Sequence, residues 1–381
     1  MTKQPILHNI RVLDFTWVLA GPYATRLLAD FGAEVIKVQP LLSAETDDAF
    51  SRSYYDTWNR NKLGVTLNLD KPEGVDIAKR LVGLCDVVAE SFAPRVMTNW
   101  GLDYKNLKKL KPGIIMVSLS LIGQSGPFKD YTGFGPAAHA FSGLTHLTGF
   151  PGGPPLGPGF SFADHISGLY ASLAVLGALE ERRKTGRGQF IDISEVAAVK
   201  NLLGEGTLEP AGNRSAEAAP HGVYPCRGKD RWCAIAVSTE KEWQGFKKAL
   251  GNPLWAEDKE FDDLAGRLRN AAALDALISQ WTRRHTAAGV MDRLQAHGVA
   301  AGMVQDAAGL AADPQLKSRG FFVDKPDIGK LVDATPIRLS ASPADYHRPA
   351  PSPGRDNAYV YGELLGLRKK EMAALKKEGV I

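Results

Sequence analysis

The apolar positions in the first 125 residues fall into short runs that alternate with amphipathic stretches. Runs of strand length, rich in Val, Ile and Leu, lie at 11–15, 34–39, 62–70, 87–91 and 113–123. The stretches between them carry the period and the end signals of helices, as at 25–33, 74–86 and 102–111. Strand, loop, helix and strand within roughly 30 residues form a βαβ unit with a parallel strand pair. The pattern predicts an α/β fold with a Rossmann-like, doubly wound parallel sheet.

A second pattern, from residue 157 to residue 193, combines a Gly/Pro-rich loop, a long apolar helix and a strand. Nearly every position between 165 and 179 is small or apolar, so we expect this helix to be buried almost all round. Asp164 stands where the loop becomes the helix. One interpretation of Asp164 is an N-cap that accepts hydrogen bonds from free backbone N–H groups. The other, compatible with the first, is a rigidly held and ionised carboxylate that acts as a nucleophile.

The second half of the chain changes character at the polar segment 205–222, which we interpret as a linker after the first part of a large domain, 1–204. Residues 223–325 predict a smaller α+β domain with two strands followed by helices. The tail, 326–381, begins strand-like, becomes Pro-rich and ends in a charged helix. Residues 41–60 show no clear period and are predicted to be a surface excursion that carries Tyr54, Tyr55 and Trp58.

Composition excludes several classes of protein. Hydrophobic residues make up 44% and charged residues 23% of the 381 positions, as in an ordinary soluble globular protein. The net charge of +4 is a small excess without a dense basic stripe, so nucleic acid is not an expected partner. Three scattered cysteines do not form a disulfide framework, and no metal-ligand spacing appears among the histidines. With no signal sequence and no apolar run of membrane-spanning length, we expect a cytoplasmic protein without a metal or a membrane partner.

Five segments of the sequence resemble the family III CoA-transferases, the family of formyl-CoA transferase and α-methylacyl-CoA racemase. They are RVLDFTWVLAGPYATRLLADFGAEVIKVQ, NRNKLGVTLNLDKPEG, AESFAPRVMTNWGL, the helix that follows Asp164, and KTGRGQFIDIS. The resemblance runs along the whole chain. It implies a large α/β domain built from both chain ends, with 326–381 returning to it, and a smaller inserted domain. It also implies an interlocked, ring-like dimer, made of two copies or with a related subunit.

The resemblance also assigns roles to residues. Asp164 matches the family's covalent nucleophile, which passes CoA onward through an aspartyl anhydride and an aspartyl-CoA thioester. CoA or acyl-CoA is then a substrate, and no cofactor is permanently bound. The positions expected to bind CoA are Trp17, Val18, Leu19, Ala20, Gly21, Leu67, Lys71, Phe92, Arg95, Asn99, Trp100 and Lys129. Pro40 and Asn99 stand where formyl-CoA transferase has basic residues, so Lys71, Arg95 and Lys129 become candidates for the CoA phosphates.

The function expected from the resemblance is transfer of CoA from an acyl-CoA donor, such as succinyl-CoA, to a free carboxylic acid. One alternative is a 2-methylacyl-CoA racemase, which needs a histidine partner for the aspartate. Phe134 stands at that position, and His139 and His165 are offset from it. Another alternative is a CoA-binding subunit of a heteromeric transferase. The aromatic residues Tyr54, Tyr55, Trp58 and Phe134 favour a bulkier or aryl acid over formate, although core packing explains them equally well.

Overall fold

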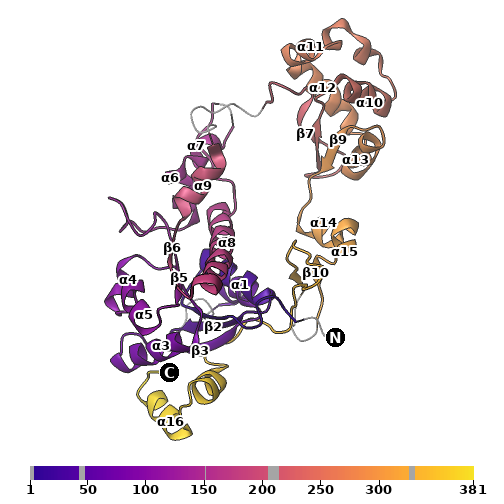
Figure 1. Cartoon of the computed structure of the whole chain (residues 1–381). Coiled ribbons are helices and arrows are strands. Elements are labelled where there is room, and N and C mark those ends of the chain that lie inside the picture. Colours follow the sequence, from indigo (N-terminus) through magenta and orange to yellow (C-terminus); the bar gives the residue numbers. More distant parts are fainter. Residues whose placement is uncertain (1–3, 43–47, 151, 205–213, 326–330) are drawn as a thin grey trace. The chain divides into compact units, whose positions relative to one another are not determined.

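The computed structural model describes residues 4–42, 48–150, 152–204, 214–325 and 331–381. The chain divides into two compact units, shown in Figure 1. One unit consists of Met1–Gly149, Pro154–Pro210 and Ser318–Ile381, and therefore contains both chain ends. The other consists of Phe150–Gly153 and Ala211–Lys317. Part of the predicted linker, 205–213, lies outside the described residues.

The first unit is built on a six-stranded parallel sheet in the order β3-β2-β1-β4-β5-β6. Its strands are β1 Arg11–Asp14, β2 Glu34–Gln39, β3 Leu63–Thr66, β4 Val87–Glu90, β5 Ile115–Ser120 and β6 Phe190–Ser194. The α/β fold and the parallel sheet expected from the sequence are confirmed. The strand order reverses between β1 and β4, and ligands of such sheets bind at the carboxyl edge beside that point.

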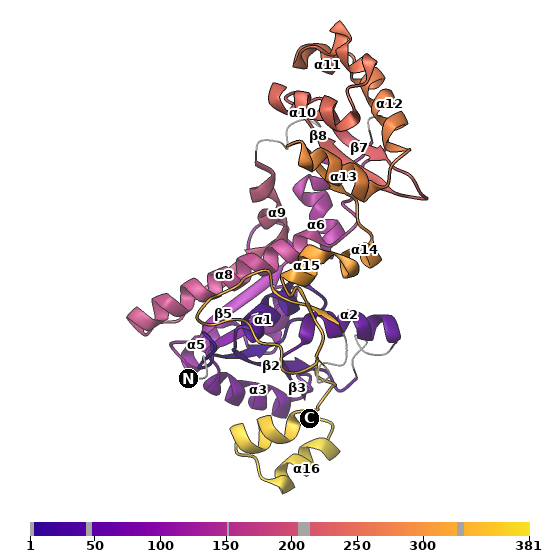
Figure 2. The ribbon, with the colours of Figure 1, turned by 90° about the vertical axis from the view of Figure 1, so that its right-hand side faces the viewer.

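Helices cover both faces of the sheet, which explains why strands β1 to β5 are buried along almost their whole length, whereas the edge strand β6 is partly exposed. The helices α1 (Ala20–Asp30) and α8 (Phe162–Thr185) pack on one face, where they enclose Val12, Val35 and Val117. The other face packs against α3 (Pro72–Leu84), α4 (Arg95–Asn99) and α5 (Tyr104–Leu110). Figure 2 shows α8 and α1 on the opposite side of the sheet from α3 and α16.

The C-terminal segment completes the second face of the sheet. Val360 and Tyr361 of the π-helix Ala358–Leu364, together with the last residues Val380 and Ile381, join the same apolar cluster as β2 and β3. The segment is also pinned by polar contacts, because the carboxylate of Asp356 accepts a hydrogen bond from the Gly64 N–H at 2.7 Å. The helix α16 (Lys369–Lys377) follows the π-helix. The short strands β10 (Phe322–Val323) and β11 (Val332–Asp333) pair with each other in the same unit.

The long helix α8 corrects one expectation from the sequence. It is buried on one side, where Gly168 lets it approach α1 closely, since a Cβ there would lie 2.8 Å from the Ala20 carbonyl oxygen. On its other side Leu169, Leu173 and Leu176 are exposed. It is also long and apolar enough to cross a membrane by length and composition, contrary to the sequence expectation. A single helix of this kind is weak evidence for a membrane span, because core helices meet the same criterion.

The segment 41–60 also differs from its prediction. Residues Ala49–Asn59 form a regular helix, α2, whose N-cap Asp48 accepts hydrogen bonds from the N–H groups of Phe50 and Ser51 at 2.8 and 3.0 Å. Phe50, Tyr54 and Trp58 lie at i, i+4 and i+8, a helical spacing that the sequence prediction did not use. The remaining helices of the unit are α6 Gly135–Ser142, α7 Leu144–Leu147 and α9 Glu195–Leu203.

The second unit combines a three-stranded antiparallel sheet, in the order β7-β8-β9, with helices. Trp243 and Phe246 of α10 stack in its core, and Cys226 and Cys233 are buried there as free thiols. The strands are β7 His221–Pro225, β8 Trp232–Ala236 and β9 Ala300–Met303. The helices are α10 Glu240–Leu250, α11 Leu264–Arg269, α12 Ala271–Thr282, α13 Ala287–Ala296, α14 Ala307–Ala312 and α15 Pro314–Ser318. The last residue of α15, Ser318, is the first residue of the chain that is again assigned to the first unit.

Candidate active site

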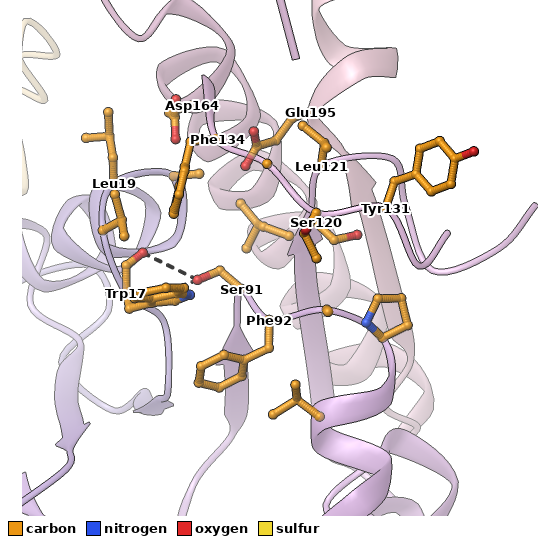
Figure 3. Close-up of a pocket in the computed structure, with 18 residues that line it drawn as sticks. Trp17, Leu19, Ser91, Phe92, Ser120, Leu121, Tyr131, Phe134, Asp164 and Glu195 are labelled. Atoms are coloured by element: carbon orange, nitrogen blue, oxygen red, sulfur yellow. Dashed lines mark hydrogen bonds between the residues drawn. The ribbon is translucent and has the colours of Figure 1, made fainter. Parts of the chain in front are cut away.

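A pocket of about 460 Å³ lies at the carboxyl edge of the sheet, beside the point where the strand order reverses. The loops that follow β1 (17–20) and β4 (91–94) form two of its walls, and the end of β5 (119–121) and the segment 131–134 form the others. Two carboxylic side chains complete the lining, Asp164 from α8 and Glu195 from α9. Figure 3 shows these two carboxyl groups toward one end of the pocket, with Trp17 and Phe92 toward the other.

Asp164 lies in the first turn of α8 and is 7% exposed. Burial raises the pKa of its carboxyl from 3.8 to about 6. Hydrogen bonds from its own backbone N–H and from the Ala20 N–H act in the opposite direction, as does the nearby His165. Ala20 is the first residue of α1, so the carboxylate is held between the N-terminal ends of two helices, where anions are favoured.

The helix α8 begins differently from the sequence prediction. Its N-cap is Ser161 rather than Asp164, which is the third residue of the helix. The free N–H of Ala163 donates a hydrogen bond to Nε2 of His139, at 3.1 Å, from the neighbouring helix α6. Burial lowers the pKa of His139, which suits a neutral ring nitrogen acting as an acceptor. His139 therefore accepts the Ala163 N–H, while the Asp164 carboxyl accepts its own backbone N–H and that of Ala20.

The loop after β1 is anchored by a buried ion pair. Asp14 accepts hydrogen bonds from the N–H and the hydroxyl of Thr16, at 2.9 and 2.5 Å, and from Lys62 at 3.0 Å. Burial alone would raise the pKa of Asp14, but Lys62, Lys37 and the hydroxyl groups of Thr16 and Thr25 lower it to about 2. The loop then places Val18 at φ 63°, a conformation that β-branched residues avoid. Such strain persists where the surroundings fix the backbone, often at functional sites.

The structure brings six of the predicted site residues together at the pocket. Trp17, Val18, Leu19, Ala20, Phe92 and Asp164 all line it. Phe134, the position at which the racemase interpretation needs a histidine, lines it as well and meets the Trp17 ring edge-on at 6.1 Å. Tyr54, Tyr55 and Trp58, the other aromatic residues that were expected near the pocket, do not line it. The Trp58 ring instead packs against Tyr23 and His165 and below the guanidinium of Arg26.

The other predicted binding residues lie outside the pocket lining. Gly21 is buried, and the space of its missing side chain is taken by Thr16. Leu67 belongs to the core under the sheet, and Trp100 supports Phe92 with an edge-on ring contact at 5.5 Å. The Lys71 ammonium is hydrogen-bonded to the Glu378 carbonyl oxygen. The remaining three predicted CoA-binding residues, Arg95, Asn99 and Lys129, are exposed on the surface.

Glu195, Ser91 and Gly135 were missed by the sequence analysis. Glu195 follows β6 directly and Ser91 follows β4, so their place at the carboxyl ends of parallel strands was a usable signal. The hydroxyl of Ser91 accepts a hydrogen bond from the Trp17 N–H at 3.1 Å and so ties two walls of the pocket together. Gly135 lies directly against the Asp164 carboxyl, so that a side chain at residue 135 would collide with it. Nothing in the sequence marks this contact, because the two residues are far apart along the chain. Among the described residues no cluster of His, Cys, Asp or Glu fits a metal ion.

A pocket beside the point where the strand order reverses, lined by a strained loop and a buried carboxylate, is the usual arrangement of a small-molecule site in an α/β fold. The match to the family model for CoA-transferase family III extends from residue 7 to residue 357, and the chain belongs to this family. The family resemblance inferred from the sequence is thereby confirmed. The chain is an acyl-CoA:carboxylate CoA-transferase.

Proteins with similar sequences are also named as CoA-transferases. The chain is 35% identical to the succinyl-CoA–D-citramalate CoA-transferase of Chloroflexus aurantiacus, over 98% of each chain. It is 33% identical to the β subunit of the succinyl-CoA–L-malate CoA-transferase of the same organism, again over 98% of each. Among solved structures, a CAIB/BAIF family protein from Brucella suis superposes with a TM-score of 0.88 at 29% identity, covering 94% of this chain and 99% of that one.

Proposed function

We propose that this enzyme moves CoA from an acyl-CoA donor of the succinyl-CoA type to a free carboxylic acid, with Asp164 as the covalent nucleophile. The observation that carries this proposal is the position of the Asp164 carboxyl, which faces the pocket from the first turn of α8. With a pKa near 6, the carboxyl is mostly ionised at neutral pH and is therefore nucleophilic.

The exchange proceeds through four substitutions at carbonyl carbons. An Asp164 oxygen attacks the thioester carbon of the donor, the C–S bond breaks, and CoA leaves as the thiolate. The thiolate then attacks the Asp164 carbonyl of the resulting anhydride, which releases the donor acid as its carboxylate and leaves an aspartyl-CoA thioester. The acceptor carboxylate attacks that thioester, expelling the thiolate. Finally the thiolate attacks the acceptor's acyl carbon and frees Asp164, and no net proton transfer is required.

The environment of Asp164 suits these steps. The Ala20 N–H that binds the carboxylate in the resting enzyme is also placed to stabilise the oxyanion that forms on the Asp164 carbonyl. Trp17, Leu19, Phe92, Leu121 and Phe134 present apolar surface to the pocket, which keeps water from the reactive anhydride. Exchange of CoA is therefore favoured over hydrolysis.

The phosphates of CoA need positive charge, and no Lys, Arg or His lines the pocket in the described part of the chain. Arg95 is the nearest candidate in sequence, because it opens α4 directly after the lining residues 91–94. It is exposed and its side chain is not engaged in any of the ion pairs among the described residues. We propose that Arg95 contacts a CoA phosphate, with Lys71 and Lys129 as further candidates.

We also propose that the enzyme works in the cytoplasm as a dimer, either of two identical chains or with a related subunit. The exposed apolar face of α8 supports assembly, since Ile166, Leu169, Tyr170 and Leu173 form a shallow apolar depression with Leu202. Apolar patches of this kind mark interaction surfaces. One similar protein is named as a β subunit. The three free and buried cysteines suit a reducing compartment.

The racemase alternative requires a base that takes a proton from the α-carbon beside Asp164. His139 does not fit this role, because its Nε2 accepts the Ala163 N–H and its ring is buried outside the pocket lining. Phe134 occupies the matching position in the pocket. The geometry therefore favours transfer over racemisation.

The test is the variant Asp164→Ala, compared with Asp76→Ala on the outer helix α3. Asp164→Ala should lose CoA exchange between labelled succinyl-CoA and a panel of acids while still binding CoA in calorimetry. Wild-type enzyme incubated with acyl-CoA should gain the mass of an acyl or CoA group on the peptide that contains residue 164. Full exchange by Asp164→Ala, or an adduct on another residue, would contradict the proposed nucleophile.

A further inference from the structure

Glu195 is a second carboxylic side chain in the pocket, and its backbone is rigidly fixed. It is the first residue of α9 and comes directly after β6. Ser194 caps this helix, because its hydroxyl accepts a hydrogen bond from the Ala197 N–H at 3.1 Å. The Glu195 side chain is 9% exposed, and the surface that it does expose lines the pocket. Figure 3 shows its carboxyl oxygens on the same side of the pocket as Asp164.

Among the residues that the structure describes, none forms a hydrogen bond or an ion pair that lowers the pKa of the Glu195 carboxyl, and the one charged group that acts on it is Asp164. Burial, and in second place the negative charge of Asp164, raises its pKa from 4.5 to about 8. Among the residues that the structure describes, no cation near Glu195 offsets this rise in pKa. His139 on α6 has a lowered pKa and is bonded to Ala163, and the Asp192 carboxylate on β6 accepts the Gln124 N–H at 3.0 Å. Burial between apolar walls and the neighbouring charge of Asp164 therefore both favour the protonated form of the Glu195 carboxyl.

A protonated carboxyl is an O–H donor, and a buried donor is costly unless it meets an acceptor. The walls around Glu195 are mostly apolar, with Leu121 and Phe134 among its labelled neighbours in Figure 3. A substrate that supplies an oxygen there gains a hydrogen bond. A hydrocarbon chain in the same place leaves the donor without a partner, and such sites discriminate strongly between substrates that do and do not carry the polar group.

We propose that Glu195 determines the choice of acid by donating a hydrogen bond to a hydroxyl or carboxyl oxygen on the chain of the acid, beyond the carboxyl that receives CoA. This inference rests on the proposed function, since it assigns the acid's chain to the pocket that holds Asp164. It predicts that acids with a second oxygen function are preferred over hydrocarbon acids of equal length. For an acid with a second carboxylate, the Glu195 proton takes the place of the cation that the pocket lacks.

The experiment measures kcat/KM for three four-carbon acceptors, L-malate, 3-hydroxybutyrate and butyrate, with succinyl-CoA as the donor. The wild type should prefer the two oxygen-bearing acids by about 10-fold or more. Glu195→Met, which keeps the volume and removes the donor, should lower their kcat/KM by about 10- to 100-fold and leave that for butyrate within about 3-fold. Glu195→Gln, which keeps an N–H donor, should retain most of the preference.

A pH series provides a second measurement that does not depend on the Met variant folding well. The wild-type preference for oxygen-bearing acids should fall as the pH rises through about 8, where Glu195 ionises, while Glu195→Gln keeps its preference. An unchanged preference in Glu195→Met, or a wild type that prefers butyrate, would overturn the role of Glu195 and leave the transferase function standing. A wild type that exchanges CoA with none of the acids would overturn both.

Discussion

The carboxyl group of Asp164 occupies the space in which a side chain at residue 135 would begin. A Cβ built on Gly135 would lie 2.3 Å from Oδ2 of Asp164, which is far inside van der Waals contact. The backbone of Gly135 is not in the left-handed region, so its conformation is open to other residues. Glycine is required here for space. The first residue of α6 thus sets the position of the carboxylate at the start of α8.

This relationship predicts the effect of Gly135→Ala. The added methyl group should displace the Asp164 carboxyl from its place beside the Ala20 N–H, because buried backbone on both sides leaves little room for relaxation. We expect kcat/KM for CoA exchange to fall by about 100-fold, as displacements near 1 Å do at reacting groups. The stability should fall by about 1–3 kcal/mol from overpacking. Steady-state kinetics and urea unfolding measure the two effects.

A matched control is Gly83→Ala in α3. Apart from its chain neighbours and the backbone of its own helix, no atom of the described residues lies within 4 Å of a Cβ built on Gly83, which is exposed and helical. Alanine is favoured over glycine in a helix by about 0.5–1 kcal/mol, so this variant should be slightly more stable and fully active. Wild-type activity in Gly135→Ala would show that Asp164 does not depend on the space left by residue 135.

The pH dependence of exchange follows from the burial of Asp164. Its carboxyl must be ionised to attack, and its pKa in the folded enzyme is about 6 instead of 3.8. We expect kcat/KM to rise between pH 5 and pH 7 with a midpoint near 6. Because the folded state holds this proton more tightly than the unfolded state, the contribution of Asp164 to stability falls as the pH rises from about 4 to about 6.

Two measurements separate these effects. Initial rates between pH 5 and pH 7.5 measure how kcat/KM rises with pH. Circular dichroism over the same range confirms that the enzyme stays folded. Urea unfolding of the wild type and Asp164→Asn over the same range gives the stability. The asparagine variant should lose stability less steeply than the wild type as the pH rises to 6. A rate that is flat from pH 5 to pH 7 would show that Asp164 is not the titrating nucleophile.

The buried pair of Asp14 and Lys62 predicts a coupled loss of stability and CoA affinity. Both side chains are fully buried, and the Lys62 ammonium also donates to the Pro22 carbonyl and the Asn59 side chain at 3.1 and 2.8 Å. Lys62→Met leaves the Asp14 charge without this partner, which should cost about 3–5 kcal/mol. Since Asp14 anchors Thr16, the loop 17–20 should also loosen and the KM for CoA should rise.

The double variant Asp14→Asn/Lys62→Met provides the control for this pair. It removes the uncompensated charge, so it should be more stable than Lys62→Met alone by about 1 kcal/mol or more in urea unfolding. Losses that simply add in the double variant would indicate that the two side chains act independently. That outcome would also remove the argument that the pair holds the loop.

The sequence predicted the parallel sheet well because its signals are local. Each strand is a short apolar run, and the residues that follow β1 and β4 meet at the pocket because parallel strands share one carboxyl edge. The expectation that α8 is buried all round was wrong for a physical reason. Its apolar residues continue onto the exposed side that carries Leu173, and composition does not distinguish a core from an interaction surface.

The polar details of the site were harder to predict, because each depends on a contact between distant residues. An N-cap was one of the two interpretations of Asp164, but His139, 24 positions before Ala163, accepts the Ala163 N–H in the first turn of the helix. Glu195 reads as an ordinary first-turn glutamate until the fold places it beside the pocket. Gly135 is likewise one of 39 glycines until the position of Asp164 is known.

His139 stabilises the start of α8 from the neighbouring helix, and its removal should affect both fold and activity. His139→Ala leaves the buried Ala163 N–H without an acceptor, which should cost about 1–3 kcal/mol. His139→Gln offers an oxygen instead and should recover part of that loss. The exposed His8, changed to Ala, serves as the control and should alter stability by less than about 0.5 kcal/mol.

The pH dependence of these variants distinguishes an acceptor from a residue that only fills space. Burial lowers the pKa of His139 in the folded enzyme. Below about pH 6.5 the imidazole is therefore protonated more fully in the unfolded chain than in the folded enzyme. As a result, the contribution of His139 to stability falls as the pH falls. His139→Gln has no such proton and should therefore lose less stability than the wild type between pH 7 and pH 5. Equal losses in urea unfolding would mean that Nε2 is not an acceptor. In that case the first turn of α8, and with it Asp164, would have to be held by other contacts.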